Sequence, residues 1–339
     1  MKTIALLILI LLLAGSAQAA QYQVHQLGIS PGFDGSEGVG INGGGTVICG
    51  AASANDTTGV FTWNHSTGLV DLHQEAVVAY VGINRHGQTV GRARYTDPWL
   101  YRPFIRNADG SRTWVPLPPG ATDASPTAIN DLGQVGMNLY YRDADYNMYR
   151  SEAAVIGADG AVLQMDVPSA SAEISSLSNT GYVGMNYNQH AYLWDSSSGL
   201  RPLVGLTDTD VTRLWDVNDS GVSVGSSGNH AVIWAADGTA RDLGLGVACG
   251  INNLGQVVGG INNRAVIWDT YGSTVDLGFG EWSCANAIND HGWIVGTVSY
   301  PDPYTFEMAV LWEPVPEPSS LLALAGGLIS CGLVWRRRH

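Results

Sequence analysis

The sequence has little charge, little cysteine and almost no lysine. Only 14% of its 339 residues are charged, where about a quarter is usual for soluble domains, and the one lysine is Lys2. The formal net charge is −14, and a body this acidic repels nucleic acid and anionic membrane surfaces. We therefore expect no nucleic-acid partner.

Four cysteines are too few for a disulfide framework. Cys49, Cys249 and Cys284 lie in the body of the chain, and Cys331 lies near the C-terminus. The three body cysteines permit one internal disulfide, and the sequence does not choose the pair. No Cys-x-x-Cys or Cys/His spacing indicates a metal site, so we expect neither a metal nor a cofactor.

Glycine and aromatic residues are abundant instead. The chain has 43 Gly, 11 Trp and 14 Tyr. This composition is typical of many tight turns between short apolar strands, and it argues against long helices and against disorder. The expected fold class is all-β.

The N-terminus predicts export. Lys2 is followed by an apolar run over residues 4–14 and by the small-residue site Ala17-Gln18-Ala19. This order is typical of a secretory signal peptide, which we assign to residues 1–19. A run of about eleven apolar residues is too short to span a membrane, so a retained anchor is the weaker interpretation.

The C-terminus resembles the PEP-CTERM sorting signal of exopolysaccharide-producing Gram-negative bacteria. Three elements in order carry the resemblance: the triplet Pro316, Glu317 and Pro318, the apolar residues 319–335, and the cluster Arg336, Arg337 and Arg338. Arginines stay on the cytoplasmic side, so the body would lie outside. The resemblance implies that residues 314–339 are a sorting tail, which inserts transiently as a transmembrane helix and is cut by an exosortase-type membrane protease. The protein would be membrane-tethered before tail processing, and at the cell surface or extracellular afterwards.

The body between the two ends is a repeat. A segment of the form Ile-Asn-x-x-Gly-x-x-Val-Gly recurs seven times, with its asparagines 34 to 49 residues apart. A period near forty residues indicates a repeat architecture. The recurring asparagines are Asn42, Asn84, Asn130, Asn179, Asn218, Asn252 and Asn289.

Each unit has the pattern of four short strands. An apolar strand ends at the asparagine, a second ends in Val-Gly, a third ends at a tryptophan such as Trp234 or Trp268, and a fourth follows a tight turn. Four strands in about forty residues are typical of a propeller blade. We therefore predict that residues 20–313 form a β-propeller with seven four-stranded blades. An open β-solenoid or two smaller domains are the alternatives.

The strand count also predicts how the ring closes. The seventh unit ends at Trp312 without a fourth strand, whereas residues 22–28 look like a fourth strand without a unit. We predict that the N-terminal strand completes the last blade, which leaves no sheet edge unpaired.

The units further resemble the HAF repeats of exported bacterial proteins. The resemblance is carried by His190-Ala191-Tyr192-Leu193-Trp194 and by His230-Ala231-Val232-Ile233-Trp234, while blades two and three lack the tryptophan. It implies a repeat fold and export, and it implies no activity.

Apparent catalytic and metal motifs fit the repeat better than they fit chemistry. The glycines Gly38, Gly40 and Gly43 match a dinucleotide fingerprint but lie in a hairpin with no helix after it. Ser223 in Gly-x-Ser-x-Gly stands where sister units have strand residues. The acid pairs Asp208/Asp210 and Asp143/Asp145 do not continue into a calcium-binding pattern. We assign no catalytic residue.

Long loops between the second and third strands of blades two, three and seven are the candidate binding site. They carry Tyr, Trp, Arg and Asp, and they leave the same face of a propeller. Two of them share the pattern Tyr-x-Asp-Pro-aromatic, in which proline stiffens the loop and lowers the entropy that binding must overcome. The candidate binding residues are Tyr95, Asp97, Trp99, Tyr101, Tyr140, Tyr141, Tyr146, Tyr149, Tyr300, Asp302 and Tyr304.

The sequence thus favours a secreted, surface-sorted, non-catalytic binding or matrix module. Its ligand would be an exopolysaccharide, because aromatic rings stack on sugars, or a surface protein, because Tyr, Trp and Arg anchor protein interfaces. The alternative is an extracellular glycan-active hydrolase or lyase with Asp97, Asp143, Asp145 and Asp302 as acid and base. Two carboxyls in one pocket, one of them with a raised pKa, would favour the enzyme.

Overall fold

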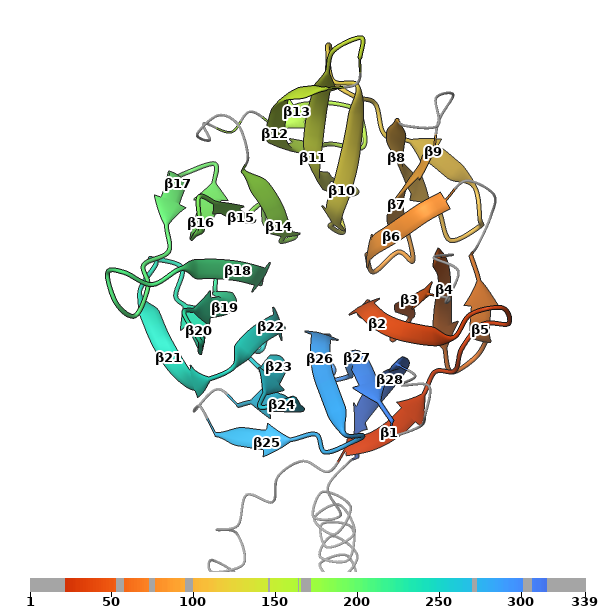
Figure 1. Cartoon of the computed structure of the whole chain (residues 1–339), viewed down its shortest axis with the longest axis vertical. Helices are drawn as coiled ribbons and strands as arrows, with labels where there is room; N and C mark the ends of the chain where they lie inside the picture. The colour runs from red at the N-terminus through yellow and green to blue at the C-terminus, as the bar shows by residue number, and fades with distance from the viewer. Residues whose placement is uncertain are drawn as a thin grey trace, which may run out of the picture. The chain divides into compact units, whose positions relative to one another are not determined.

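In the computed structural model each repeat folds as one four-stranded antiparallel sheet, and seven such sheets surround a common axis as propeller blades (Figure 1). The structure describes residues 22–52, 58–72, 77–94, 100–145, 147–163, 165, 172–269, 273–300 and 307–315. Contacts divide the chain into one unit of residues 24–312, which holds the propeller, and a second unit of residues 1–23 and 313–339. The predicted all-β, seven-bladed fold is confirmed. No helix within the described ranges is long and apolar enough to cross a membrane, and the predicted tail helix lies outside those ranges.

The first two strands of each blade contain the recurring sequence pattern of the repeat. The innermost strands, which lie nearest the axis, are β2 (Gly35–Ile41), β6 (Val77–Ile83), β10 (Asp123–Ile129), β14 (Glu173–Leu177), β18 (Thr212–Val217), β22 (Val247–Ile251) and β26 (Trp282–Ile288). The second strands are β3 (Val47–Ala52), β7 (Thr89–Arg94), β11 (Val135–Arg142), β15 (Val183–Tyr187), β19 (Ser223–Ser227), β23 (Val257–Ile261) and β27 (Ile294–Ser299).

The last two strands complete each blade toward its outer edge. The third strands are β4 (Thr58–Asn64), β8 (Tyr101–Arg106), β12 (Met148–Ile156), β16 (His190–Asp195), β20 (His230–Trp234), β24 (Arg264–Trp268) and β28 (Glu307–Pro314). The outermost strands are β5 (Gly68–Asp71), β9 (Arg112–Trp114), β13 (Val162–Leu163), β17 (Gly199–Pro202), β21 (Ala240–Leu245), β25 (Thr274–Asp276) and β1 (Tyr22–Gln26).

Two positions of the repeat are occupied by glycine for different physical reasons. The turn glycine adopts the left-handed region, for example with a φ of 72° at Gly133, which other residues adopt at a cost. In blades five to seven the glycine of the Val-Gly pair lies against the backbone of the innermost strand: a Cβ on Gly225 would stand 1.9 Å from the carbonyl oxygen of Arg213. The turn and, in these blades, the close approach of the first two strands therefore require glycine.

The tryptophan that ends several third strands belongs to the core between blades. Trp234, Trp268 and Trp312 are fully buried. Each indole N–H donates to a backbone carbonyl of the preceding blade or of its connection, for example from Trp234 Nε1 to Val204 O at 2.7 Å. A buried tryptophan with a satisfied N–H contributes large apolar area without an unpaired donor.

The N-terminal strand closes the ring as predicted. β1 pairs with β28, so the sheet of blade seven has the order β1-β28-β27-β26 (Figure 1). The ladder continues to Leu27, whose N–H donates to Ala309 O at 3.0 Å. Leu27 is 4% exposed and packs in the same core as Leu311.

Strand direction gives the propeller two unlike faces. The hairpin from the first strand to the second and the turn from the third to the fourth lie at one end of the axis, which we call the turn face. The connections from the second strand to the third, and those between blades, lie at the other end, which we call the loop face. The described predicted residues Tyr101, Tyr140 and Tyr300 lie at the strand ends of the loop face.

Candidate functional site

On the turn face, an asparagine side chain closes the first hairpin of six blades. In blade three, Asn130 Oδ1 accepts from the N–H of Leu132 at 3.1 Å and of Gln134 at 2.9 Å. The backbone N–H groups of the turn are therefore satisfied by the asparagine, as in other side-chain-capped turns. The six residues are Asn42, Asn84, Asn130, Asn218, Asn252 and Asn289.

The same asparagines connect neighbouring blades. The amide nitrogen of each donates to the backbone carbonyl of the equivalent residue one blade further on, at 3.1 Å from Asn42 to Asn84. The series passes through the junction of the ring, since Asn289 Nδ2 donates to Asn42 O at 3.1 Å. All six asparagines are buried. We call this circle of side chains the amide ring.

Blade four departs from the amide ring, and the prediction of Asn179 in this series is wrong by one residue. Ser178 occupies the ring position, where its Oγ accepts from Tyr182 N–H at 2.9 Å. A serine hydroxyl is too short to reach the next blade. Its neighbours make the link instead: Thr180 Oγ1 donates to Asp219 O at 2.7 Å, and Asn179 Nδ2 donates to Asp219 Oδ2 at 3.2 Å.

A second circle of polar residues lies directly after the amide ring in sequence. In most blades the backbone N–H of this residue donates to Oδ1 of its counterpart in the next blade, at 2.8 Å for Asp131 to Asn179. Gly43 has no side chain, so the series is open at blade one. The other members are Arg85, Asp131, Asn179, Asp219, Asn253 and Asp290. Both circles border a cavity of about 510 Å³.

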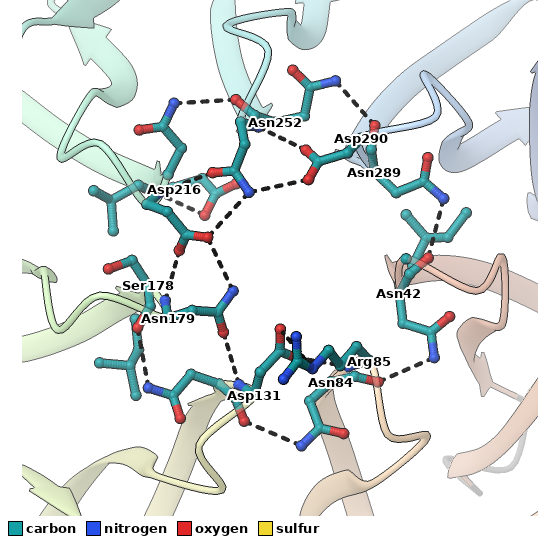
Figure 2. Close-up of a pocket in the computed structure, with 18 of the residues that line it drawn as sticks. Asn42, Asn84, Arg85, Asp131, Ser178, Asn179, Asp216, Asn252, Asn289 and Asp290 are labelled. Atoms are coloured by element: carbon teal, nitrogen blue, oxygen red, sulfur yellow. Dashed lines mark hydrogen bonds and ion pairs between the residues drawn. The ribbon is translucent and has the colours of Figure 1, made fainter.

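Asp216 adds a partly buried acid to this cavity (Figure 2). Its position on β18 is taken by Gly, Ala or Ser in the other blades. Its carboxylate accepts from Ser176 Oγ at 2.6 Å and from Ile251 N–H at 3.1 Å, so it touches the blades on both sides. Burial raises the pKa of Asp216, although these hydrogen bonds oppose the shift.

The turn face is therefore built mainly to hold the ring together. Most of its amide and carboxylate groups are already used between blades, as Figure 2 shows. The described residues that line the cavity are amides, acids, small polar residues, aliphatic residues and Arg85.

The loop face has different chemistry, with arginines over tyrosine rings. The guanidinium of Arg92 lies 5.1 Å from the centre of the Tyr101 ring, and its Nη1 donates to Ser125 Oγ at 3.2 Å. The guanidinium of Arg142 lies 5.8 Å from the centre of the Tyr140 ring. These residues, together with Asp123, come from blades two and three, and we call them the Arg–Tyr cluster.

An ion pair fixes one end of the Arg–Tyr cluster. Arg142 Nε donates to Asp123 Oδ2 at 2.7 Å. The Asp123 side chain is 3% exposed, whereas that of Arg142 is 29% exposed. Burial raises the pKa of the Tyr140 phenol, so this phenol is a neutral hydrogen-bonding group at physiological pH. The cluster therefore combines fixed cations with partly exposed aromatic rings.

The structure locates some of the predicted binding residues. Tyr101 and Tyr140 belong to the Arg–Tyr cluster. Tyr141 packs in the core of blade three at 6% exposure, with its hydroxyl donating to Glu152 Oε2 at 2.8 Å. Tyr149 belongs to β12, and its side chain is not among those described. Outside the described ranges lie Tyr95, Asp97, Trp99, Tyr146, Asp302 and Tyr304.

Tyr300 is held at the start of its loop by two contacts. Its hydroxyl accepts from Gln26 Nε2 at 2.8 Å, and its ring meets the Phe279 ring edge-on with 5.8 Å between centres. The residue lies on blade seven, on the loop face.

Two tryptophans on innermost strands were missed by the sequence reasoning. Trp215 is 40% exposed, and the guanidinium of Arg213 stacks 4.5 Å from its ring centre. Trp282 is 36% exposed. At the position of Trp215 the other blades carry Val, Thr, Ser, Cys or Asn, and a departure of this size from the repeat was the available signal.

The carboxylates outside the turn face have pKa values that are shifted in different directions. Burial and the charge of Glu307 raise the pKa of Glu37 on β2. By contrast, Asp143 Oδ1 accepts from the N–H of Asn147 at 2.9 Å and of Asp145 at 3.0 Å, and these bonds lower the pKa of Asp143. Asp210 accepts from the hydroxyls of Thr207 and Ser227, both at 2.7 Å. Asp143 and Asp210 thus cap their own loops.

Comparison with known proteins identifies the tail and the fold. Residues 314–338 match the PEP-CTERM protein-sorting motif. This motif supports an exported, surface-sorted protein that is anchored by its tail and then processed by an exosortase. No curated protein is significantly similar in sequence.

Several solved structures have a similar fold. Virginiamycin B lyase from Staphylococcus aureus matches with a TM-score of 0.59 at 11% identity, over 87% of this chain and all of that one. The β-propeller domain of the Trilobed protease from Pyrococcus furiosus matches with a TM-score of 0.56 at 9% identity, over 83% of this chain and 95% of that one. At such identities the similarity shows the propeller fold alone.

Proposed function

We propose that the protein is an exported binding module whose loop face holds a polysaccharide. The Arg–Tyr cluster is the observation that supports this proposal. Aromatic rings pack against the apolar faces of sugars, and guanidinium and carboxylate groups exchange hydrogen bonds with their hydroxyls. Trp215 on β18 and Trp282 on β26 add exposed aromatic rings on two innermost strands.

The sorting signals complete the proposal. Residues 1–19 are removed as a signal peptide, residues 20–313 are the binding body, and residues 314–339 are the tail that an exosortase cuts. The likeness of the third strands to HAF repeats agrees with export and remains a prediction. Delivery to the surface of a bacterium that makes exopolysaccharide brings the loop face to such a ligand.

A polysaccharide array with matched variants tests the proposal. Tyr101→Ala and Tyr140→Ala should each weaken binding by about 1 to 3 kcal/mol, which is the usual loss for an aromatic anchor. Leu132→Ala and Leu254→Ala are the controls, because both residues are 62% exposed and belong to the turn face. The proposal fails if the controls lose binding and the tyrosine variants do not. It also fails if the protein binds only a protein ligand and no polysaccharide.

A glycan-active enzyme is the second candidate, because Glu37 has a raised pKa near a second carboxylate, Glu307. Two neighbouring carboxyl groups, one of them with a raised pKa, are the arrangement that glycoside cleavage uses. Asp143, by contrast, has a lowered pKa, which does not suit a general acid. Release of new reducing ends from a bound polysaccharide, abolished by Glu37→Gln, would replace the binding proposal by this one.

A further inference from the structure

Two of the three body cysteines lie on neighbouring innermost strands. Cys249 is in β22 of blade six, and Cys284 is in β26 of blade seven. Both are partly exposed. Cys49 is fully buried in a separate core with Val47 and Phe61, so it has no access to either.

The backbone brings these two side chains together. A Cβ on Gly250 would lie 3.1 Å from the Cα of Ala287, which shows how closely β22 and β26 approach. A Cβ on Gly260 would lie 3.8 Å from Cys284 Sγ, so the Cys284 side chain projects toward blade six. Cys249 stands at the irregularity in the β22–β23 ladder, between Ala248 and Gly250, where the regular alternation of side chains is broken.

The two thiols are close enough to influence one another. The neighbouring Cys249 side chain lowers the pKa of the Cys284 thiol, while Cys284 and burial raise the pKa of the Cys249 thiol. A thiol that loses its proton more readily is the attacking group in disulfide exchange.

We propose that Cys249 and Cys284 are a disulfide-forming site, which covalently joins the innermost strands of blades six and seven once the protein is exported. The oxidant is a disulfide, either of an exported dithiol oxidase or of a small molecule. The site depends on the compartment to which the sorting tail directs the protein and not on any ligand of the loop face.

The exchange is balanced in two steps. The Cys284 thiolate attacks one sulfur of the oxidant, the S–S bond of the oxidant breaks, and its other sulfur leaves as a thiolate. The Cys249 thiolate then attacks Cys284 Sγ in the mixed disulfide, and the second sulfur of the oxidant leaves. The oxidant takes up two electrons and becomes two thiols, which receive the two protons from the cysteines.

The bond would stabilise the blade at which the ring is closed. It links two strands that belong to neighbouring blades and are separated by most of blade six in sequence. A cross-link of this kind stabilises mainly by restricting the unfolded chain. Blade seven is completed by the non-covalent pairing of β1 with β28, so the covalent link ties this blade to the rest of the ring.

Differential alkylation of the exported full chain tests the site. Cells are quenched in acid, and the denatured protein is alkylated before and after reduction and then mapped by mass spectrometry. Cys49 should be alkylated without reduction, whereas Cys249 and Cys284 should react only after it. A peptide pair joined through these two cysteines, lighter than its parts by two hydrogen atoms, is the expected product.

Matched variants separate the site from general oxidation. Cys249→Ser should leave Cys284 free, and Cys49→Ser should leave the linked peptide unchanged. A reductant should lower the unfolding midpoint of the wild type and of Cys49→Ser, but not that of Cys249→Ser. Alkylation of Cys249 and Cys284 in the exported protein without reduction, or a disulfide that contains Cys49, would overturn the proposal.

Discussion

In each of six blades, one asparagine side chain makes two kinds of hydrogen bond. Its oxygen caps the hairpin of its own blade, and its nitrogen binds the next blade. A buried amide that uses both ends in this way leaves no polar atom unpaired. This is why the repeat keeps asparagine, and why aspartate is not equivalent at the same position.

Replacing Asn218 by aspartate isolates the bond between blades. The carboxylate keeps an acceptor for the N–H groups of Ser220 and Val222, but it loses the donor to Asn252 O at 3.1 Å and places a negative oxygen there instead. We expect Asn218→Asp to lower the free energy of unfolding by about 1 to 3 kcal/mol, measured by urea denaturation. Asn218→Ala, which also loses the cap, should cost more. Equal stability of Asn218→Asp and the wild type would contradict the role of the amide ring.

We expect Asp216 to make the stability of the propeller depend on pH. Because burial raises its pKa, the folded state holds a proton that the unfolded state releases above the ordinary aspartate pKa of about 4. Its contribution to stability is therefore present at low pH and is lost as pH rises through the raised pKa. We expect the difference in unfolding free energy between Asp216→Asn and the wild type to shift in favour of the variant from about pH 4 upward. A difference that does not change with pH would show that the pKa is not raised.

At the scale of elements, the alternation of side chains along strands decides which predicted residues reach solvent. Tyr140 and Tyr141 are neighbours on β11, so their side chains point to opposite faces of the sheet. One joins the Arg–Tyr cluster and the other enters the core of blade three. Aromatic content selected both residues as candidates from the sequence, because composition does not distinguish the two faces of a strand.

The N-terminal strand is the element whose removal should matter most. Deleting residues 22–28 removes β1 together with Leu27 and leaves β28 as an open sheet edge. We expect a lower midpoint and a less cooperative thermal transition, followed by circular dichroism. Deleting only residues 1–20 is the control and should leave the transition unchanged. A deletion of 22–28 that melts like the control would show that closure does not depend on this strand.

At the scale of the whole molecule, the fold was predictable because it is periodic. Seven similar units fix the blade count, and the unmatched fourth strand fixes the closure. The register of blade four was misassigned because Asn179 was chosen by residue type, although the spacing to Gly181 indicates Ser178. The bond from Asn130 Nδ2 to Ser178 O at 3.1 Å shows that Ser178 stands in the ring. Trp215 and the Cys249–Cys284 contact were missed because a repeat pattern describes what the units share. Both features come from residues at which one innermost strand differs from the others.

The tail defines the mature form of the molecule. Since the sorting motif spans residues 314–338, we expect the native product to lack the residues after about Ser319, as motif-directed cleavage would leave it. Intact-mass measurement of protein recovered from the producing cells checks this. A mass that still includes Arg336, Arg337 and Arg338 would contradict tail processing.

Closure by β1 and β28 also sets the order in which the molecule can be assembled during export. The strand that crosses the membrane first has to wait for the strand that crosses last, so blade seven is incomplete until almost the whole body has been translocated. Pairing over such a sequence distance is slow, because the chain between the partners has to be ordered first. During that interval the unpaired strand edges of the incomplete ring are open to aggregation.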